Sequence, residues 1–202
     1  MLFRHLILPL TTMALVLGLG QPAMADSYEP EYEIIKKHDK VQLRCYKAFT
    51  VAETTMSDEY RSASYTGFKR LAGFIFGKND KNEKMAMTKP VSMRPSPEDP
   101  TGSWNMFFVM PPNYKDLGKP QPQGQNIKIY DVKPFCALNI RFSGWANNDD
   151  LAEYTAQLLK VAKANKYELT GEESHLLVFN QPMIPGPFRR NEVILKVKKP
   201  KP

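Results

Sequence analysis

The sequence predicts an α+β fold in which a strand–helix–strand–strand unit occurs twice and closes into one sheet system or a distorted β-barrel. The order of patterns carries this prediction, because each half reads as a β-branched and aromatic strand, an amphipathic helix and two further strands. Spacing supports it. Cys45 lies 13 residues before Asp58, where the first helix is expected to begin, and Cys136 lies 13 residues before Asp149 in the second helix. The halves therefore align with an offset of 91 residues.

The first half begins with a polar leader over residues 26–33 and then a long predicted strand over 41–53, which is rich in β-branched and aromatic side chains. A helix is expected over residues 57–77. Ser57 or Asp58 is its expected N-cap, and a glycine follows its last turn, where helices commonly end. Two further strands complete this half, at 84–93 and 104–110.

The second half follows a segment rich in Pro, Gly and Gln, residues 114–125, which has no periodicity and predicts a surface linker. Residues 127–142 predict a strand in which Pro134 marks a bulge or an edge. A helix is expected over 147–165, with Asn147 or Asn148 as its cap. The last two strands are expected at 175–180 and 193–197.

Residues 1–25 have the pattern of a secretory signal peptide. A basic start is followed by an apolar run over 6–19 and by Ala23 and Ala25 in a small-x-small cleavage pattern. The run is shorter than the about 20 residues that a membrane helix needs. The alternative is an uncleaved anchor, against which the cleavage pattern counts. We expect cleavage before Asp26, leaving 177 residues with a formal net charge of +6 in the periplasm, without stable membrane insertion. Export makes nucleic acid an unfavoured partner.

Cys45 and Cys136 leave two alternatives open. In an oxidising compartment such a pair is a disulfide candidate. The other alternative is two separately buried thiols, because equivalence within a repeat does not by itself bring two residues together.

The sequence contains no nucleophile elbow, HExxH motif or P-loop, so we expect a binding protein and not an enzyme. His38, expected in a solvated loop, and His175, expected at the start of a strand, have no partner at metal-ligand spacing, and no metal site is predicted. A set of methionines favours core packing over copper binding. Its members are Met85, Met87, Met93, Met106 and Met110.

Several segments together resemble the SOUL haem-binding family. The most specific is KMAMTKPV at 84–91, followed by RRNEV at 189–193; GFKRLA at 67–72, FGKN at 76–79 and FVMP at 108–111 agree in order and spacing. The resemblance spans residues 32–197. It implies that residues 26–202 form a SOUL domain, a distorted β-barrel with two helices. It also implies non-covalent binding of haem or another tetrapyrrole in a shallow apolar groove on the first helix and beside the loop at 181–188.

The groove residues that the resemblance implies lie on the helix and around this loop. Tyr65, Gly73 and Pro185 stand where better-known haem binders place basic side chains, and Arg61, Lys69 or Arg189 are the candidate replacements. A core stripe is the alternative role for Phe68 and Ala72. The expected function is a periplasmic haem carrier, buffer or scavenger; the alternative is an enzyme or binding module for another small apolar ligand in the same groove. The candidate residues are Tyr65, Phe68, Ala72, Phe76, Met183, Ile184 and Arg189.

Overall fold

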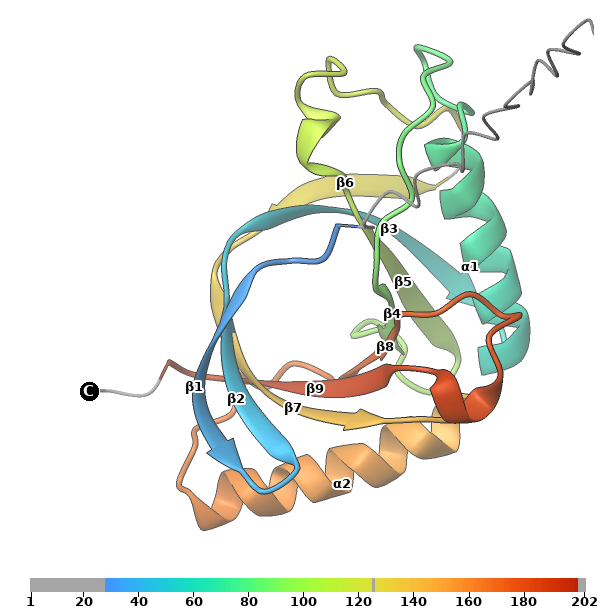
Figure 1. The fold of residues 1–202 in the computed structure, drawn as a ribbon. Coiled ribbons are helices and arrows are strands. Elements are labelled where there is room, and N and C mark those ends of the chain that lie inside the picture. Colours follow the sequence, from blue (N-terminus) through green and yellow to red (C-terminus); the bar gives the residue numbers. More distant parts are fainter. Residues whose placement is uncertain (1–27, 125, 200–202) are drawn as a thin grey trace, which may run out of the picture.

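The computed structural model describes residues 28–124 and 126–199, in which nine antiparallel strands form one sheet that curls around a central space (Figure 1). Two helices pack against the outer side of the curl. This confirms the predicted α+β distorted barrel. Within the described residues, no helix is both long and apolar enough to cross a membrane. The predicted signal peptide, residues 1–25, lies outside the described residues.

The strands follow the order β1-β2-β7-β9-β8-β4-β5-β3-β6 across the sheet. The elements are β1 (Tyr32–His38), β2 (Val41–Tyr46), β3 (Phe49–Ser57), α1 (Tyr60–Ile75), β4 (Val91–Pro95), β5 (Ser103–Val109), the 3₁₀ turn η1 (Pro112–Tyr114), β6 (Ile127–Val132), β7 (Phe135–Phe142), α2 (Asn148–Ala164), β8 (His175–Val178), the 3₁₀ turn η2 (Gly186–Phe188) and β9 (Asn191–Val197).

The sheet order shows the duplication directly. The counterparts in the two halves are β2 and β6, β3 and β7, β4 and β8, and β5 and β9. If every strand from β2 to β6 is replaced by its counterpart, the strand order is reversed but otherwise unchanged, as a twofold repeat requires. Each repeat therefore carries two strands before its helix. The predicted strand over 41–53 divides into β2 and β3, and that over 127–142 divides into β6 and β7 beside Pro134. The division is needed because β2 pairs with β7 of the other half, whereas β3 pairs with β5 and β6.

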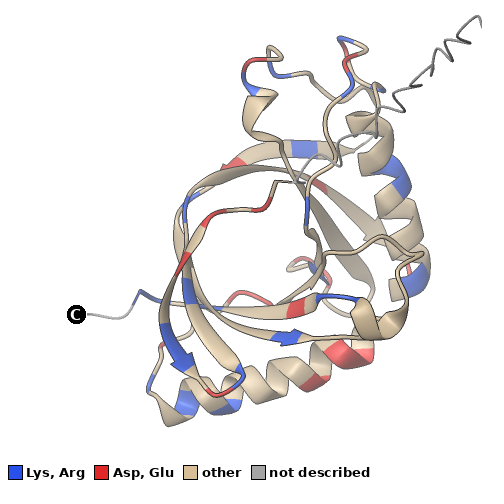
Figure 2. Ribbon diagram, in the orientation of Figure 1, with Lys and Arg blue, Asp and Glu red and all other residues tan. Residues whose placement is uncertain are grey.

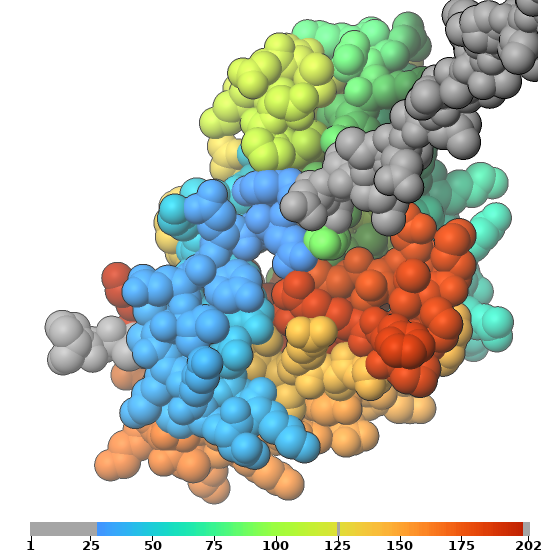
Figure 3. Space-filling view, viewed as in Figure 1, coloured from blue at the N-terminus to red at the C-terminus, as the bar shows by residue number. Residues whose placement is uncertain are grey.

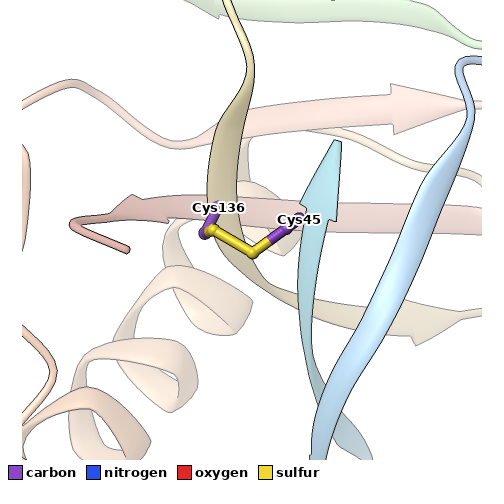
Figure 4. The surroundings of a disulfide bond; sticks show 2 residues. All are labelled: Cys45 and Cys136. Carbon is purple, nitrogen blue, oxygen red and sulfur yellow. A yellow bond between two sulfur atoms is a disulfide. The ribbon is translucent and has the colours of Figure 1, made fainter. Parts of the chain in front are cut away.

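The repeat offset is 84 to 88 residues, not 91: β4 and β8 begin at Val91 and His175, β2 and β6 at Val41 and Ile127, and α1 and α2 at Tyr60 and Asn148. Cys45 on β2 and Cys136 on β7 are therefore not equivalent positions. They nevertheless face each other in register across the β2–β7 pair and form a disulfide (Figure 4). Of the two alternatives that the sequence left open, the disulfide is the one that the structure contains.

The main hydrophobic core lies between the two helices and the sheet. Leu71, Phe74 and Ile75 of α1 and Leu158 of α2 are almost completely buried in it. The methionines belong to the same core, which confirms their interpretation as packing residues. Met85, Met93, Met106 and Met110 are buried there, and Met87 packs against them.

The α2 boundaries are confirmed, since Asn147 caps the helix by accepting hydrogen bonds from the N–H groups of Asp149 and Asp150. The predicted α1 cap was wrong. Glu59 occupies the N-cap position without a side-chain cap bond, because β3 continues through Ser57, which pairs with Ser103 of β5. The glycine expected after the last turn, Gly77, has φ +106° there.

Three other boundaries differ from the prediction. Residues 84–90 are irregular apart from one bridge between Lys84 and Phe76, and β4 begins only after Pro90, which has no N–H for a ladder. Residues 32–38, partly assigned to a polar leader, form the edge strand β1. In the expected surface linker, Tyr114 is buried and its hydroxyl donates to the Pro120 carbonyl at 3.0 Å.

Candidate functional site

Four of the predicted groove residues form an apolar stripe along the outer side of α1. Tyr65, Phe68 and Ala72 follow one another at helical spacing on α1, and Phe76 at the C-cap continues the row. Tyr65 and Phe76 are well exposed and Phe68 is 43% exposed, while Ala72 is buried between them. The Phe68 ring meets Phe108 edge-on, with ring centroids 5.5 Å apart. The stripe is thus an exposed row of rings with a small residue in its middle, anchored to the core through Phe68.

The loop before β9 carries the remaining predicted residues. Met183 and Phe188 are strongly exposed and Ile184 is half-buried. Turn hydrogen bonds shape this loop, including those from Ile184 N–H to the Gln181 carbonyl and from Phe188 N–H to the Pro185 carbonyl. It presents two large apolar side chains on a defined backbone.

The loop is built against the corner at Gly144 and Trp145. Gly144 N–H donates to the Gly186 carbonyl at 2.9 Å, and a Cβ at Gly186 would lie 3.2 Å from Trp145 Nε1, so a glycine fits this close approach. Among the described residues, no hydrogen bond or ion pair joins the loop to α1. A groove shared by the stripe and the loop therefore stays a prediction.

Arg189 ends this loop and is buried. Its guanidinium stacks over the Trp145 ring at 4.3 Å, and Nη2 donates to the Asn180 carbonyl at 3.3 Å. Its Nε and Nη1 atoms have no hydrogen-bond partner in the described part of the chain. Buried donors of a cation that lack a partner favour the approach of an acceptor, and a carboxylate is the strongest one.

A second candidate site lies inside the curl of the sheet and was not predicted from the sequence. It is a cavity of about 500 Å³, and Figure 3 shows an opening between the blue N-terminal segment and the red segment that leads into β9. Figure 2 shows both basic and acidic residues on the strands around this space. All nine strands of the sheet contribute lining residues, among them Tyr32, Arg44, Tyr46, Val51, Ser92, Arg94, Phe107, Val109, Tyr130, Phe135, His175, Leu177, Glu192, Ile194 and Lys196.

Aromatic rings with cations over them form much of the cavity wall. The Tyr46 and Phe135 rings stack with centroids 5.0 Å apart. The Arg190 guanidinium lies 3.7 Å from the Phe179 ring centroid, and Lys196 Nζ lies 4.8 Å from that of Phe135. Such cation–π contacts hold charged groups against apolar surface.

One part of the wall is closed by ion pairs around Glu192, a carboxylate that is 1% exposed. Glu192 accepts hydrogen bonds from Arg44 at 2.9 Å, from Asn139 at 2.8 Å and from Arg190 at 2.9 Å. Arg190 also bonds Glu29 in the N-terminal segment at 2.9 Å. These partners compensate the cost of burying the Glu192 charge, so this part of the wall is internally satisfied.

Another part of the wall, around His175, is not satisfied. His175 Nδ1 lies 3.0 Å from Ser92 Oγ, whereas its buried Nε2 has no partner among the described residues. Glu172 Oε2 lies 2.5 Å from Lys196 Nζ and 3.6 Å from Arg94 Nη1, so two cations share one carboxylate. The Nε atom of Arg94 is buried and has no partner among the described residues. Burial, followed by the charges of Arg94 and Lys196, lowers the pKa of His175 well below its usual value. The imidazole is therefore neutral.

The sequence does contain a signal for this cavity. Positions 190, 192, 194 and 196 line it, while Asn191, Val193 and Leu195 between them are buried on the other face of β9. Charged residues at alternate strand positions ordinarily indicate a face in water, so the pattern alone does not reveal an interior.

His38 is not the solvated loop residue that the sequence predicted, since it ends β1 and its Nε2 lies 2.8 Å from the Tyr167 hydroxyl. Within the described ranges, no three His, Cys, Asp or Glu side chains are placed to hold a metal.

The family model and the named relatives agree on one family. The family model described as SOUL heme-binding protein matches residues 27–196. Heme-binding protein 1 of Sus scrofa is 26% identical over 196 residues, covering 89% of this chain and 98% of that protein. Heme-binding protein 2 of Mus musculus is 27% identical, covering 84% and 83%. Among solved structures, the EcmrR C-terminal domain is similar with a TM-score of 0.59 at 12% identity, covering 83% of this chain and 98% of that one, which shows a shared fold alone.

Proposed function

Because this chain belongs to the SOUL heme-binding protein family, we propose that it binds haem or a related tetrapyrrole non-covalently on the outer stripe of α1 and the loop at 181–189. The exposed apolar row on α1 carries the proposal. A helix that covers a core needs only its inner face to be apolar, yet Tyr65, Phe68 and Phe76 stand on the outer face. Such a row offers a flat apolar surface to a tetrapyrrole ring.

The loop supplies the second set of contacts in this proposal. Met183 and Phe188 add exposed apolar surface. Arg189 has guanidinium nitrogens without partners among the described residues and is the candidate for a propionate carboxylate. In this role the protein supplies a platform and an anchor and performs no chemistry of its own, which makes it a binding protein and not an enzyme.

We further propose that the protein works as a carrier, buffer or scavenger in the periplasm. The pattern of residues 1–25 supports export. The Cys45–Cys136 disulfide also supports it, because structural disulfides persist in oxidising compartments.

Haemin titration followed by the Soret band tests the location. Phe68→Asp places a charge in the stripe, and we expect it to weaken haemin binding by about tenfold or more, equivalent to about 1.4 kcal/mol. Leu159→Asp is the matched control, because Leu159 lies on α2 and is 41% exposed, close to the 43% of Phe68. We expect the control to bind haemin within about twofold of the unaltered protein.

Circular dichroism shows whether each variant is folded. Equal haemin affinity in folded Phe68→Asp and Leu159→Asp contradicts the α1 stripe as the site. Absence of a saturable one-to-one Soret shift in the unaltered protein contradicts haem binding itself.

A further inference from the structure

We propose that the cavity inside the sheet is a second ligand site, which takes a small carboxylate with a flat apolar body. This site goes beyond the proposed haem site. The sheet separates the two, because α1 packs on the outer face and the cavity lies on the inner face (Figure 1). Its ligand therefore need not compete with haem.

The volume and the lining of the cavity determine the size and shape of the apolar part of the ligand. A volume of about 500 Å³ falls in the range of pockets for small organic ligands. Phe107, Phe135 and Tyr46 line it together with the aliphatic Val109 and Leu177. Aromatic rings prefer offset or edge-on contact with other rings, so a flat aromatic body suits these walls.

Unpartnered polar atoms at and beside His175 set the polar end of the ligand. His175 Nδ1 lies 3.0 Å from Ser92 Oγ, and its buried Nε2 has no hydrogen-bond partner among the described residues. Arg94 Nε is buried without a partner in the same part of the chain. Both side chains line the cavity. An unmade hydrogen bond at a buried polar atom costs free energy, which a ligand group that reaches the atom recovers.

The charges around these atoms select an anion. Arg94 and Lys196 are two cations that share the single carboxylate of Glu172. The neighbouring Glu53 is bonded to Asn105 at 2.6 Å. A ligand carboxylate meets cations and N–H donors here, whereas a ligand ammonium meets Arg94 and Lys196 and is repelled.

A pair of fluorescent probes with the same body tests this chemistry. 1-Pyrenebutyrate carries the carboxylate, and 1-pyrenebutanol replaces it with a hydroxyl. We expect the intact protein to bind 1-pyrenebutyrate one-to-one and about tenfold or more tightly than 1-pyrenebutanol in a fluorescence titration. Equal affinity for the two probes overturns the proposed carboxylate selectivity.

Variants then locate the binding. We expect Arg94→Gln and Lys196→Gln each to weaken 1-pyrenebutyrate binding by about tenfold while changing 1-pyrenebutanol binding little. Lys160→Gln is the matched control, because Lys160 is exposed on α2 and does not line the cavity. Leu177→Trp fills the cavity and should abolish binding of both probes, which keeps the test decisive if a charge variant fails to fold.

The two proposed sites can fail separately. Phe68→Asp should leave 1-pyrenebutyrate binding unchanged, and Arg94→Gln should leave haemin binding unchanged. If folded Phe68→Asp loses 1-pyrenebutyrate binding while Arg94→Gln retains it, the probe binds on the stripe and the cavity site is overturned. If haemin displaces 1-pyrenebutyrate from the intact protein and also binds Arg94→Gln weakly, then haem itself occupies the cavity. That outcome overturns a separate second site.

Discussion

His175 illustrates how the surroundings of a single residue decide its role. It begins β8 as its sequence position indicates, but the structure buries it beside Arg94 and Lys196 and against the Phe107 ring, with centroids 5.4 Å apart. These neighbours come from three other strands, β4, β9 and β5. Sequence reasoning about one histidine therefore finds the strand but not the cavity.

The buried neutral state of His175 predicts a loss of stability in acid. The unfolded chain takes up a proton near pH 6.5, whereas the folded chain resists it because the pKa of His175 is lowered well below that value. The unfolded state then binds more protons below pH 6.5. The His175 contribution to stability is thus fully present above that pH and is lost as the pH falls, by at most about 1.4 kcal/mol per pH unit.

His175→Gln tests this in urea unfolding at several pH values. The glutamine retains a hydrogen-bonding group for Ser92 but does not titrate. We expect the free energy of unfolding of the variant to fall less steeply than that of the unaltered protein between pH 6.5 and 5. Parallel pH profiles for the two proteins would show that His175 does not cause the loss.

The predicted groove residues show what residue patterns can and cannot establish. Helical spacing groups Tyr65, Phe68 and Ala72 on α1, with Phe76 at its C-cap. Spacing cannot tell an outer helix face from an inner one. Phe68 lies at the border between the two faces, since its ring is partly exposed and also packs on Phe108. The place of Arg189 on the Trp145 ring also escapes the sequence, because that contact joins positions 44 residues apart.

At the scale of elements, the two helices differ in how they begin. α2 has a complete capping box, in which Asn147 accepts from the N–H groups of the first turn and Asp150 accepts from the N–H of Asn147 at 2.9 Å. α1 begins at Tyr60, and its N-cap residue Glu59 makes no side-chain cap bond. The first turn of α1 thus relies on packing and solvent for its free N–H groups.

This difference predicts unequal costs for the same substitution. Asn147→Ala removes the cap acceptor of α2, and we expect the free energy of unfolding to fall by about 1 kcal/mol. Glu59→Ala removes no cap bond from α1 and should change it by less than about 0.5 kcal/mol. Thermal or urea unfolding measures both variants. Equal losses at the two positions would mean that the capping box of α2 contributes nothing specific.

Helices were easier to predict than strand boundaries for a physical reason. A helix makes its hydrogen bonds within one segment, so its periodicity and caps are local, and α2 was placed correctly. Strand partners come from elsewhere, and the run over 41–53 does not show that β2 and β3 join different neighbours. β1 gave no alternation at all, since six of its seven residues are exposed.

At the scale of the whole molecule, the duplicated halves are interleaved and do not lie side by side as separate units. β2 of the first half pairs with β7 of the second, and β6 of the second pairs with β3 of the first. β1 joins the rest of the sheet through β2. The Cys45–Cys136 disulfide thus fastens the β1–β2 hairpin, which carries Tyr32, Arg44 and Tyr46 of the cavity wall.

The disulfide should contribute substantially to stability, because it joins positions 91 residues apart. Restricting a loop of this length in the unfolded chain stabilises by about 4–5 kcal/mol in the chain-entropy model, although measured values are commonly about 2–4 kcal/mol. We expect Cys45→Ala/Cys136→Ala to lose about 2–4 kcal/mol in urea unfolding. The single variant Cys45→Ala should lose nearly as much, because either substitution removes the same bond.

The natural state of the two cysteines is measured on protein recovered from the periplasm without exposure to reductant. We expect its N-terminal sequence to begin at Asp26 and its denatured form to show no titratable thiol before reduction and two afterwards. Reduction of the unaltered protein should then lower its stability to that of the double alanine variant, since both treatments release the β1–β2 hairpin from β7. Two thiols before reduction, or a reduced protein as stable as the oxidised one, would contradict a structural role for the disulfide.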